Sequence, residues 1–167
     1  MADPGSLDHA EMILQDTVQI KSPPERVWRF IEDPKQMTYW NPKIQKITPI
    51  SWGERHKGYR YRITYVLGNR ANDFLAEIAE YEKPTRLVIR LTEGNLAPDG
   101  YVREVYELSG NNNGTLLRQR IEIENVEINI FLKLLMIVIH HLGSPVGKKY
   151  LVRLKELAES KTNGFHS

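Results

Sequence analysis

Two helix starts follow each other closely near the beginning of the sequence. In the first, Ser22-Pro23-Pro24-Glu25, Ser22 suits a cap, Pro23 the first helical position, and Glu25 completes a capping box. The second, Asp33-Pro34-Lys35-Gln36, repeats this arrangement eleven residues later. The sequence therefore predicts a short helix that stops and is followed almost at once by a second short helix.

Strand patterns dominate the rest of the chain up to residue 124. One strand is predicted before the two helices, over 12–20, and the later ones are predicted over 44–50, 59–66, 69–82, 85–92, 101–108 and 115–124. The clearest is 59–66, where tyrosine and isoleucine alternate with arginine and threonine with a period of two. The segment 110–114, Gly-Asn-Asn-Asn-Gly, predicts a hairpin turn between the last two strands.

The C-terminal part has two helical patterns. Residues 128–141 form the most apolar stretch, which is shorter than the roughly 20 residues that a membrane span needs. Gly143-Ser144-Pro145 restarts a helix, and apolar side chains recur on one side of it. We expect this last helix to pack on the sheet through the stripe formed by Val146, Tyr150, Leu151, Leu154, Leu157 and Ala158.

Composition excludes several kinds of chemistry. The 167 residues predict one domain over 11–161, with a flexible leader or cloning remnant at 1–10 and a flexible tail at 162–167. The net charge is +2 and no basic block stands out, so we expect no nucleic-acid partner. The chain has no cysteine, which excludes disulfides and thiolate catalysis and is compatible with the cytoplasm, and no secretory signal is visible. His140 and His141 point about 100° apart on a helix, and we expect neither a metal nor an organic cofactor.

Five short segments carry a resemblance to a known superfamily. They are Ser22–Trp28, Trp40–Pro42, Gly58–Tyr61, Glu82–Leu87 and Gly114-Thr115. In order and spacing, over about residues 12–160, the chain resembles the START/Bet v 1-like (SRPBCC) superfamily and its polyketide cyclase/dehydrase-like branch. The resemblance implies an α+β helix-grip fold, in which a curved antiparallel sheet wraps around a long C-terminal helix, with two short helices after the first strand. Such proteins usually hold an apolar pocket for lipids, sterols, polyketides or hormones, and a minority are enzymes.

In each strand, apolar residues recur at every second position, and we expect the side chains at these positions to face such a pocket. Arg60 and Arg62 then point to solvent. Glu104 and Gln119 are polar exceptions on the apolar face, and a carboxylate there must be paired or protonated. A tight hairpin would place Glu104 opposite Gln119 and Tyr106 opposite Leu117. The predicted ligand-binding residues are Tyr59, Tyr61, Tyr65, Phe74, Ile89, Glu104, Tyr106, Leu117 and Gln119.

Three functions remain open from the sequence. The leading one is sequestration or delivery of an apolar or aromatic small molecule. The second is a cofactor-independent cyclase or dehydratase, in which Glu104 exchanges protons while a tyrosine polarises a carbonyl. The third is an interaction module that docks residues 128–139 on a membrane surface or a partner protein. Glu104 is either a hydrogen-bonded structural carboxylate or a functional one, and the protein is either a monomer or a homodimer.

Overall fold

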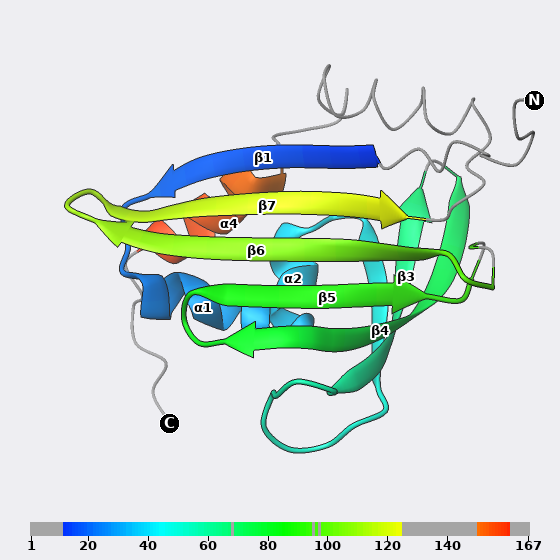
Figure 1. The fold of residues 1–167 in the computed structure, drawn as a ribbon. Helices are drawn as coiled ribbons and strands as arrows, with labels where there is room; N and C mark the ends of the chain where they lie inside the picture. Colours follow the sequence, from blue (N-terminus) through cyan, green and yellow to red (C-terminus); the bar gives the residue numbers. More distant parts are fainter. Residues whose placement is uncertain (1–11, 68, 95, 97, 125–149, 161–167) are drawn as a thin grey trace, which may run out of the picture.

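The computed structural model describes residues 12–67, 69–94, 96, 98–124 and 150–160, and it contains one seven-stranded antiparallel sheet (Figure 1). The strands lie in the order β1-β7-β6-β5-β4-β3-β2. The elements are β1 (Met12–Ile20), α1 (Pro24–Glu32), α2 (Pro34–Trp40), β2 (Ile44–Pro49), β3 (Arg60–Leu67), β4 (Arg70–Glu82), β5 (Arg86–Thr92), β6 (Tyr101–Asn111), β7 (Gly114–Glu124) and α4 (Tyr150–Glu159). Figure 1 shows the three described helices on the same face of the sheet. This is the predicted helix-grip α+β architecture.

The two short helices form where the sequence predicts them, but only the second has the predicted cap. The Asp33 side chain caps α2 by accepting a 3.1 Å hydrogen bond from the Lys35 backbone N–H. No side chain caps α1, so the predicted Ser22 capping box is wrong. Pro23 itself occupies the cap position in an extended conformation, and α1 begins at Pro24. Ser22 therefore lies one residue too early to reach the first free N–H groups of the helix.

The helices bury one face each against the sheet and against one another. The indole rings of Trp28 in α1 and Trp40 in α2 are fully buried. Helix α4 contacts β1, α2 and α1. Its predicted apolar stripe is confirmed for the described residues: the buried members are Leu151, Leu154 and Ala158, and the partly buried ones are Tyr150 and Leu157. The predicted start of this helix at Pro145 lies outside the described residues.

The predicted facing of the sheet is confirmed. Arg60 and Arg62 are exposed, and they form ion pairs with Glu77 and Glu93. Val102 and Ile121 are partly buried. The remaining side chains predicted to face inward are buried: Tyr59, Tyr61, Ile63, Tyr65, Phe74, Ala76, Ile78, Leu87, Ile89, Leu91, Glu104, Tyr106, Leu108, Leu117, Gln119 and Ile123.

The predicted register of the β6–β7 hairpin is wrong by two residues. Both strands extend into the predicted turn, so that only Asn112 and Asn113 connect Asn111 to Gly114. Because the turn is centred later than expected, Tyr106 lies opposite Gln119 and Leu108 lies opposite Leu117. Glu104 lies opposite Ile121 instead of Gln119. A shift by two residues leaves every side chain on its predicted face.

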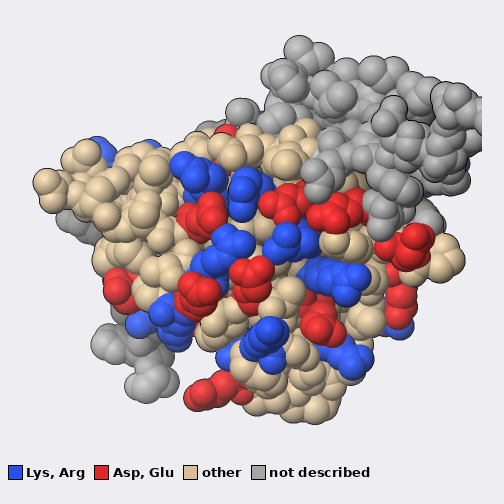
Figure 2. All heavy atoms as spheres, in the orientation of Figure 1, with Lys and Arg blue, Asp and Glu red and all other residues tan. Residues whose placement is uncertain are grey.

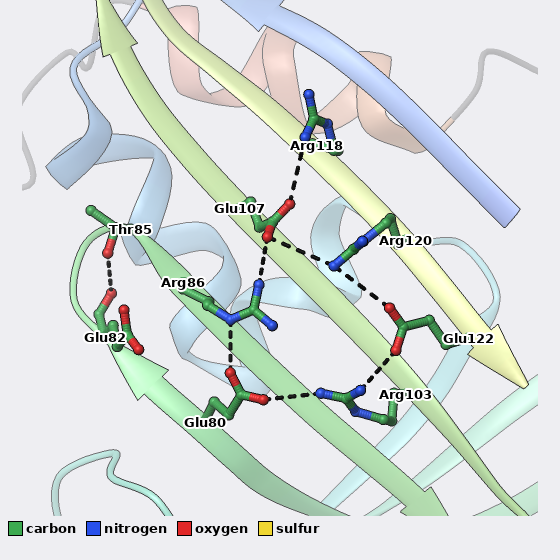
Figure 3. A network of polar contacts seen from close by, with 9 residues as sticks. All are labelled: Glu80, Glu82, Thr85, Arg86, Arg103, Glu107, Arg118, Arg120 and Glu122. Atoms are coloured by element: carbon green, nitrogen blue, oxygen red, sulfur yellow. Dashed lines mark hydrogen bonds and ion pairs between the residues drawn. The ribbon is translucent and has the colours of Figure 1, made fainter. Parts of the chain in front are cut away.

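Acidic and basic side chains are interspersed on the outer face of the sheet (Figure 2). Glu80 bridges Arg86 and Arg103 (Figure 3). Its carboxylate oxygens lie 2.7 Å from Arg86 Nε and 2.9 Å from a terminal guanidinium nitrogen of Arg103. Glu107 and Glu122 continue this network toward β7. Val88 and Val105 lie opposite each other on this same face and are nevertheless fully buried. The aliphatic stems of long charged side chains commonly cover such positions.

The predicted interaction segment at 128–139 lies outside the described residues, as do the predicted leader at 1–10 and tail at 162–167. Among the residues that the structure does describe, no helix is long and apolar enough to cross a membrane.

Candidate functional site

Glu104 lies at the centre of a polar cluster on the mostly apolar inner face of the sheet. Its side chain projects inward from β6, and only 6% of the residue is exposed. Tyr65 donates a 2.7 Å hydrogen bond to Glu104 Oε1, and Tyr106 donates a 3.0 Å hydrogen bond to Oε2. Gln119 Nε2 donates to the Tyr106 hydroxyl at 3.0 Å. Both carboxylate oxygens of Glu104 therefore have a hydroxyl donor.

The hydrogen bond from Tyr65 to Glu104 shows how strongly the sheet curves. Tyr65 belongs to β3 and Glu104 to β6, and β4 and β5 lie between these strands in the sheet. Neighbouring strands are about 4.8 Å apart, so β3 and β6 would be about 14 Å apart in a flat sheet. A direct contact between the two side chains requires the inner face to be concave. The cluster lies inside that concavity.

Burial changes the proton affinity of the whole cluster. It raises the pKa of Glu104 above its ordinary value near 4.5, while the hydroxyls of Tyr65 and Tyr106 and the charge of Lys43 oppose that rise. The pKa values of Tyr65 and Tyr106 are raised by burial first and by Glu104 second. The two tyrosines therefore stay protonated and act as donors, and Glu104 binds a proton more readily than an exposed glutamate does.

Lys43 approaches the cluster from the junction between α2 and β2. Its side chain is half-buried, and desolvation lowers its pKa, while the negative charge of Glu104 opposes this effect. Lys43 Nζ lies 5.9 Å from the centre of the Tyr150 ring in α4. The Tyr150 ring also stacks on Trp40 at a centroid distance of 6.2 Å. Residues from two helices and one loop thus lie near the cluster.

Among the residues that the structure describes, two buried polar atoms on the inner face have no hydrogen-bond partner. They are the hydroxyl of Tyr61 and Oε1 of Gln119. The single proton of Tyr106 is donated to Glu104, so the Tyr106 oxygen can only accept a hydrogen bond from Gln119. The amide nitrogen of Gln119 must therefore face Tyr106, which leaves Oε1 without a partner in the described part of the chain. Buried polar groups of this kind usually bind water or a ligand.

The family model for "Polyketide cyclase / dehydrase and lipid transport" matches residues 12–159. The chain belongs to this family. No significant match was found among proteins of curated function.

Solved structures share this fold at low sequence identity. The protein TTHA0849 from Thermus thermophilus is 20% identical, with a TM-score of 0.65 over 89% of this chain and 97% of that one. A START superfamily protein from Mycobacterium smegmatis is 18% identical, with a TM-score of 0.65 over 87% and 98% of the two chains. Ginseng major latex-like protein 151 from Panax ginseng is 14% identical, with a TM-score of 0.64 over 90% and 99%. At these identities the likeness shows the fold alone.

The structure brings together most of the residues that the sequence predicted for a site of this family. Tyr65 packs edge-on against Phe74 at a ring distance of 6.2 Å, and Ile89 lies opposite Glu104 in the β5–β6 ladder. Tyr59 lies at one end of the group and contacts the guanidinium of Arg55 at 4.4 Å. Whether these residues bind a ligand stays a prediction.

Sequence reasoning did not identify two members of the site, Lys43 and Tyr150. Tyr150 was expected only as part of the apolar stripe of the last helix. Lys43 directly follows Trp40-Asn41-Pro42, one of the family-like segments, and this was the one available signal for it. Nothing in a strand or helix period indicates that its amine lies near Glu104.

Two hollows in the described part of the chain lie elsewhere. One, of about 1000 Å³, is open and lies where the β6–β7 hairpin tip meets the segment 21–24 and Lys155. The other, of about 240 Å³, lies beside Glu107 and Arg118 on the outer side. The internal cavity expected between the sheet and the C-terminal helix therefore stays a prediction. Within the described ranges, no group of three or more His, Cys, Asp and Glu side chains could hold a metal ion.

Proposed function

We propose that this family member binds an apolar or aromatic small molecule, such as a lipid or a polyketide, against the inner face of its sheet, and sequesters or delivers it. The observation that carries the proposal is the buried polar cluster around Glu104 on a face that is mostly aliphatic and aromatic. Ligand sites for such molecules are mostly apolar, with a few polar groups that set the orientation of the ligand.

Stability alone is a poor explanation for this cluster. Taking a carboxylate out of water is unfavourable, and a well-packed apolar group in its place is often neutral or stabilising. The Tyr61 hydroxyl and Gln119 Oε1 add two buried atoms without partners, which is also unfavourable. Departures from the rules of a stable core tend to occur at functional sites. The description of the matching family, which includes lipid transport, supports the same proposal.

Native mass spectrometry of the purified protein, followed by solvent extraction, tests this proposal. We expect a bound species that organic solvent releases, and rebinding of that species to the stripped protein. Glu104→Gln should change its affinity. Glu107→Gln, on the outer face of the same strand, is the matched control and should leave affinity unchanged. Unchanged binding by Glu104→Gln would assign Glu104 to structure alone, and a protein that binds neither extract nor apolar probes would refute the proposal.

A second candidate function is a cyclase or dehydratase reaction without a cofactor. It is favoured by one observation: a carboxyl group with a raised pKa lies between two tyrosine hydroxyls. Such a group exchanges its proton at a higher pH than an exposed glutamate does, and a tyrosine could polarise a carbonyl. Incubation with a linear poly-β-ketone thioester, followed by product analysis, tests it. Faster cyclisation than the buffer reaction, lost in Glu104→Gln, is the expected result for an enzyme.

A further inference from the structure

We propose that the polar end of the ligand is a hydroxyl group, which accepts a hydrogen bond from Tyr61 and donates one to Oε1 of Gln119. This inference rests on the proposed function and names the chemical class of the ligand.

The two unpartnered atoms are deeply buried and belong to distant strands. Tyr61, on β3, is 1% exposed, and Gln119, on β7, is 3% exposed. Both side chains point to the inner face, and each lies near the same carboxylate. Tyr61 interacts electrostatically with Glu104, and Gln119 reaches Glu104 through the Tyr106 hydroxyl. Both atoms therefore lie on the inner side of the sheet, near Glu104.

The hydrogen-bonding direction at each atom is defined. Gln119 Oε1 can only accept, and its orientation is set by the bond from Nε2 to Tyr106. Burial is the main cause that raises the pKa of Tyr61, and the nearby Glu104 raises it further. The Tyr61 hydroxyl is therefore protonated and has a proton to donate. A group that satisfies both atoms must accept from one and donate to the other.

This requirement excludes several ligand groups. An ether or a ketone accepts hydrogen bonds but cannot donate one to Gln119. A carboxylate accepts only and would also be repelled by the ionised form of Glu104. An alcohol or a phenol does both with a single small group. A buried water molecule would do the same, and the experiment must distinguish it from a ligand.

Matched sets of probes test the inference directly. One set is naphthalene, 2-methoxynaphthalene and 2-naphthol, and the other is dodecane, 1-methoxydodecane and dodecan-1-ol. Within each set the carbon skeleton is shared, and only the last member both accepts and donates. We expect the wild-type protein to bind the hydroxyl compound about tenfold more tightly than its methyl ether in at least one set, the effect of about one buried hydrogen bond.

Tyr61→Phe removes the proton that both the hydroxyl compound and the ether accept, so it should weaken the binding of both by about tenfold relative to the hydrocarbon. The preference for the hydroxyl compound over the ether should persist, because it comes from donation to Gln119. Tyr81→Phe is the matched control, because it removes the same atom from an inner-face tyrosine whose hydroxyl already donates to Glu32 at 2.7 Å. Tyr81→Phe should keep the wild-type affinities for all three members of each set.

A second readout uses the ligand-free protein. Removing an unpartnered buried hydroxyl should leave the denaturation midpoint of Tyr61→Phe equal to or above the wild-type value, whereas Tyr81→Phe should lower it. A lower midpoint for Tyr61→Phe would show that its hydroxyl is bonded within the protein or to a buried water, and would overturn the inference.

The remaining outcomes separate the two proposals. A wild-type protein that binds hydrocarbon, ether and alcohol equally well would overturn the hydroxyl inference and leave the proposed function standing. A wild-type protein that binds no member of either set and yields no extract would overturn both.

Discussion

Tyr106 lies directly opposite Gln119 in the β6–β7 ladder, and its hydroxyl oxygen accepts a 3.0 Å hydrogen bond from Gln119 Nε2. The same hydroxyl donates to Glu104 Oε2 at 3.0 Å. Tyr106 therefore connects Glu104 to Gln119, two residues that do not face each other in the sheet. A substitution at Glu104 should therefore alter the hydrogen bond of Gln119, because both residues bond to the Tyr106 hydroxyl.

Glu104→Leu and Glu104→Gln should differ clearly in stability. Leucine would leave the hydroxyls of Tyr65 and Tyr106 without an acceptor in a buried site, and we expect a loss of about 2–4 kcal/mol in the free energy of unfolding. Glutamine keeps one acceptor oxygen and removes the buried charge, so we expect a change within about 1 kcal/mol of wild type. Urea unfolding measures both. Equal stability of the two variants would show that the hydroxyls find other partners.

The buried carboxyl also predicts a pH dependence of stability. Its pKa in the folded protein is raised above the ordinary value near 4.5, so between these two values the folded state binds more protons than the unfolded state. The contribution of Glu104 is therefore most favourable below about pH 4.5 and is lost as the pH rises through the folded pKa. We expect the free energy of unfolding of wild type, relative to Glu104→Gln, to fall over this window and then level off. A difference that rises with pH would contradict the sign of the shift.

Much of the fold could be predicted because one face of each strand is buried. In 59–66 the alternation of tyrosine and isoleucine with arginine and threonine leaves only one way to face a core, and the structure confirms it. The cap at Asp33 was predictable because its signal is local. The turn was not, because three consecutive asparagines and two flanking glycines allow more than one tight connection. Alternatives that differ by two residues in register bury the same faces.

The site was only half predictable for a related reason. Glu104 stands out in the sequence because it is a carboxylate at a strand position where the alternation predicts an apolar, inward-facing side chain. Its partner Tyr65 comes from a strand three positions away in the sheet, and the contact depends on curvature that no local pattern records. Lys43 depends on how the junction between α2 and β2 is placed over the sheet. Alternation thus predicts which way a side chain points, but not which distant side chain it meets.

On the outer face of the sheet, replacing a buried valine should lower the free energy of unfolding more than neutralising a charged side chain. Val88→Ala removes fully buried methyl groups beneath the ion network, and we expect it to lower the free energy of unfolding by about 2 kcal/mol. Glu80→Gln weakens ion pairs of the partly exposed Arg86 and Arg103, and we expect a loss below about 1 kcal/mol that shrinks in high salt. Denaturant unfolding at low and high salt compares them. A larger loss for Glu80→Gln would mean that the network, and not the valine pair beneath it, stabilises this face.

Two glycines with positive φ should differ in how much stability the protein loses when each is replaced by alanine. Gly114 has φ +111°, and a Cβ there would lie 2.2 Å from the Ile20 carbonyl oxygen and 2.8 Å from the Ser22 nitrogen. Gly58 has φ +90°, with nothing within 4 Å of an added Cβ. Alanine at either position must adopt a left-handed backbone conformation, which costs about 1–2 kcal/mol. At Gly114 the added Cβ must in addition displace the end of β1 from the start of β7. We expect Gly58→Ala to lose about 1 kcal/mol and Gly114→Ala about 3 kcal/mol or more in urea unfolding. Equal losses would show that the contact between the hairpin and the end of β1 yields without strain.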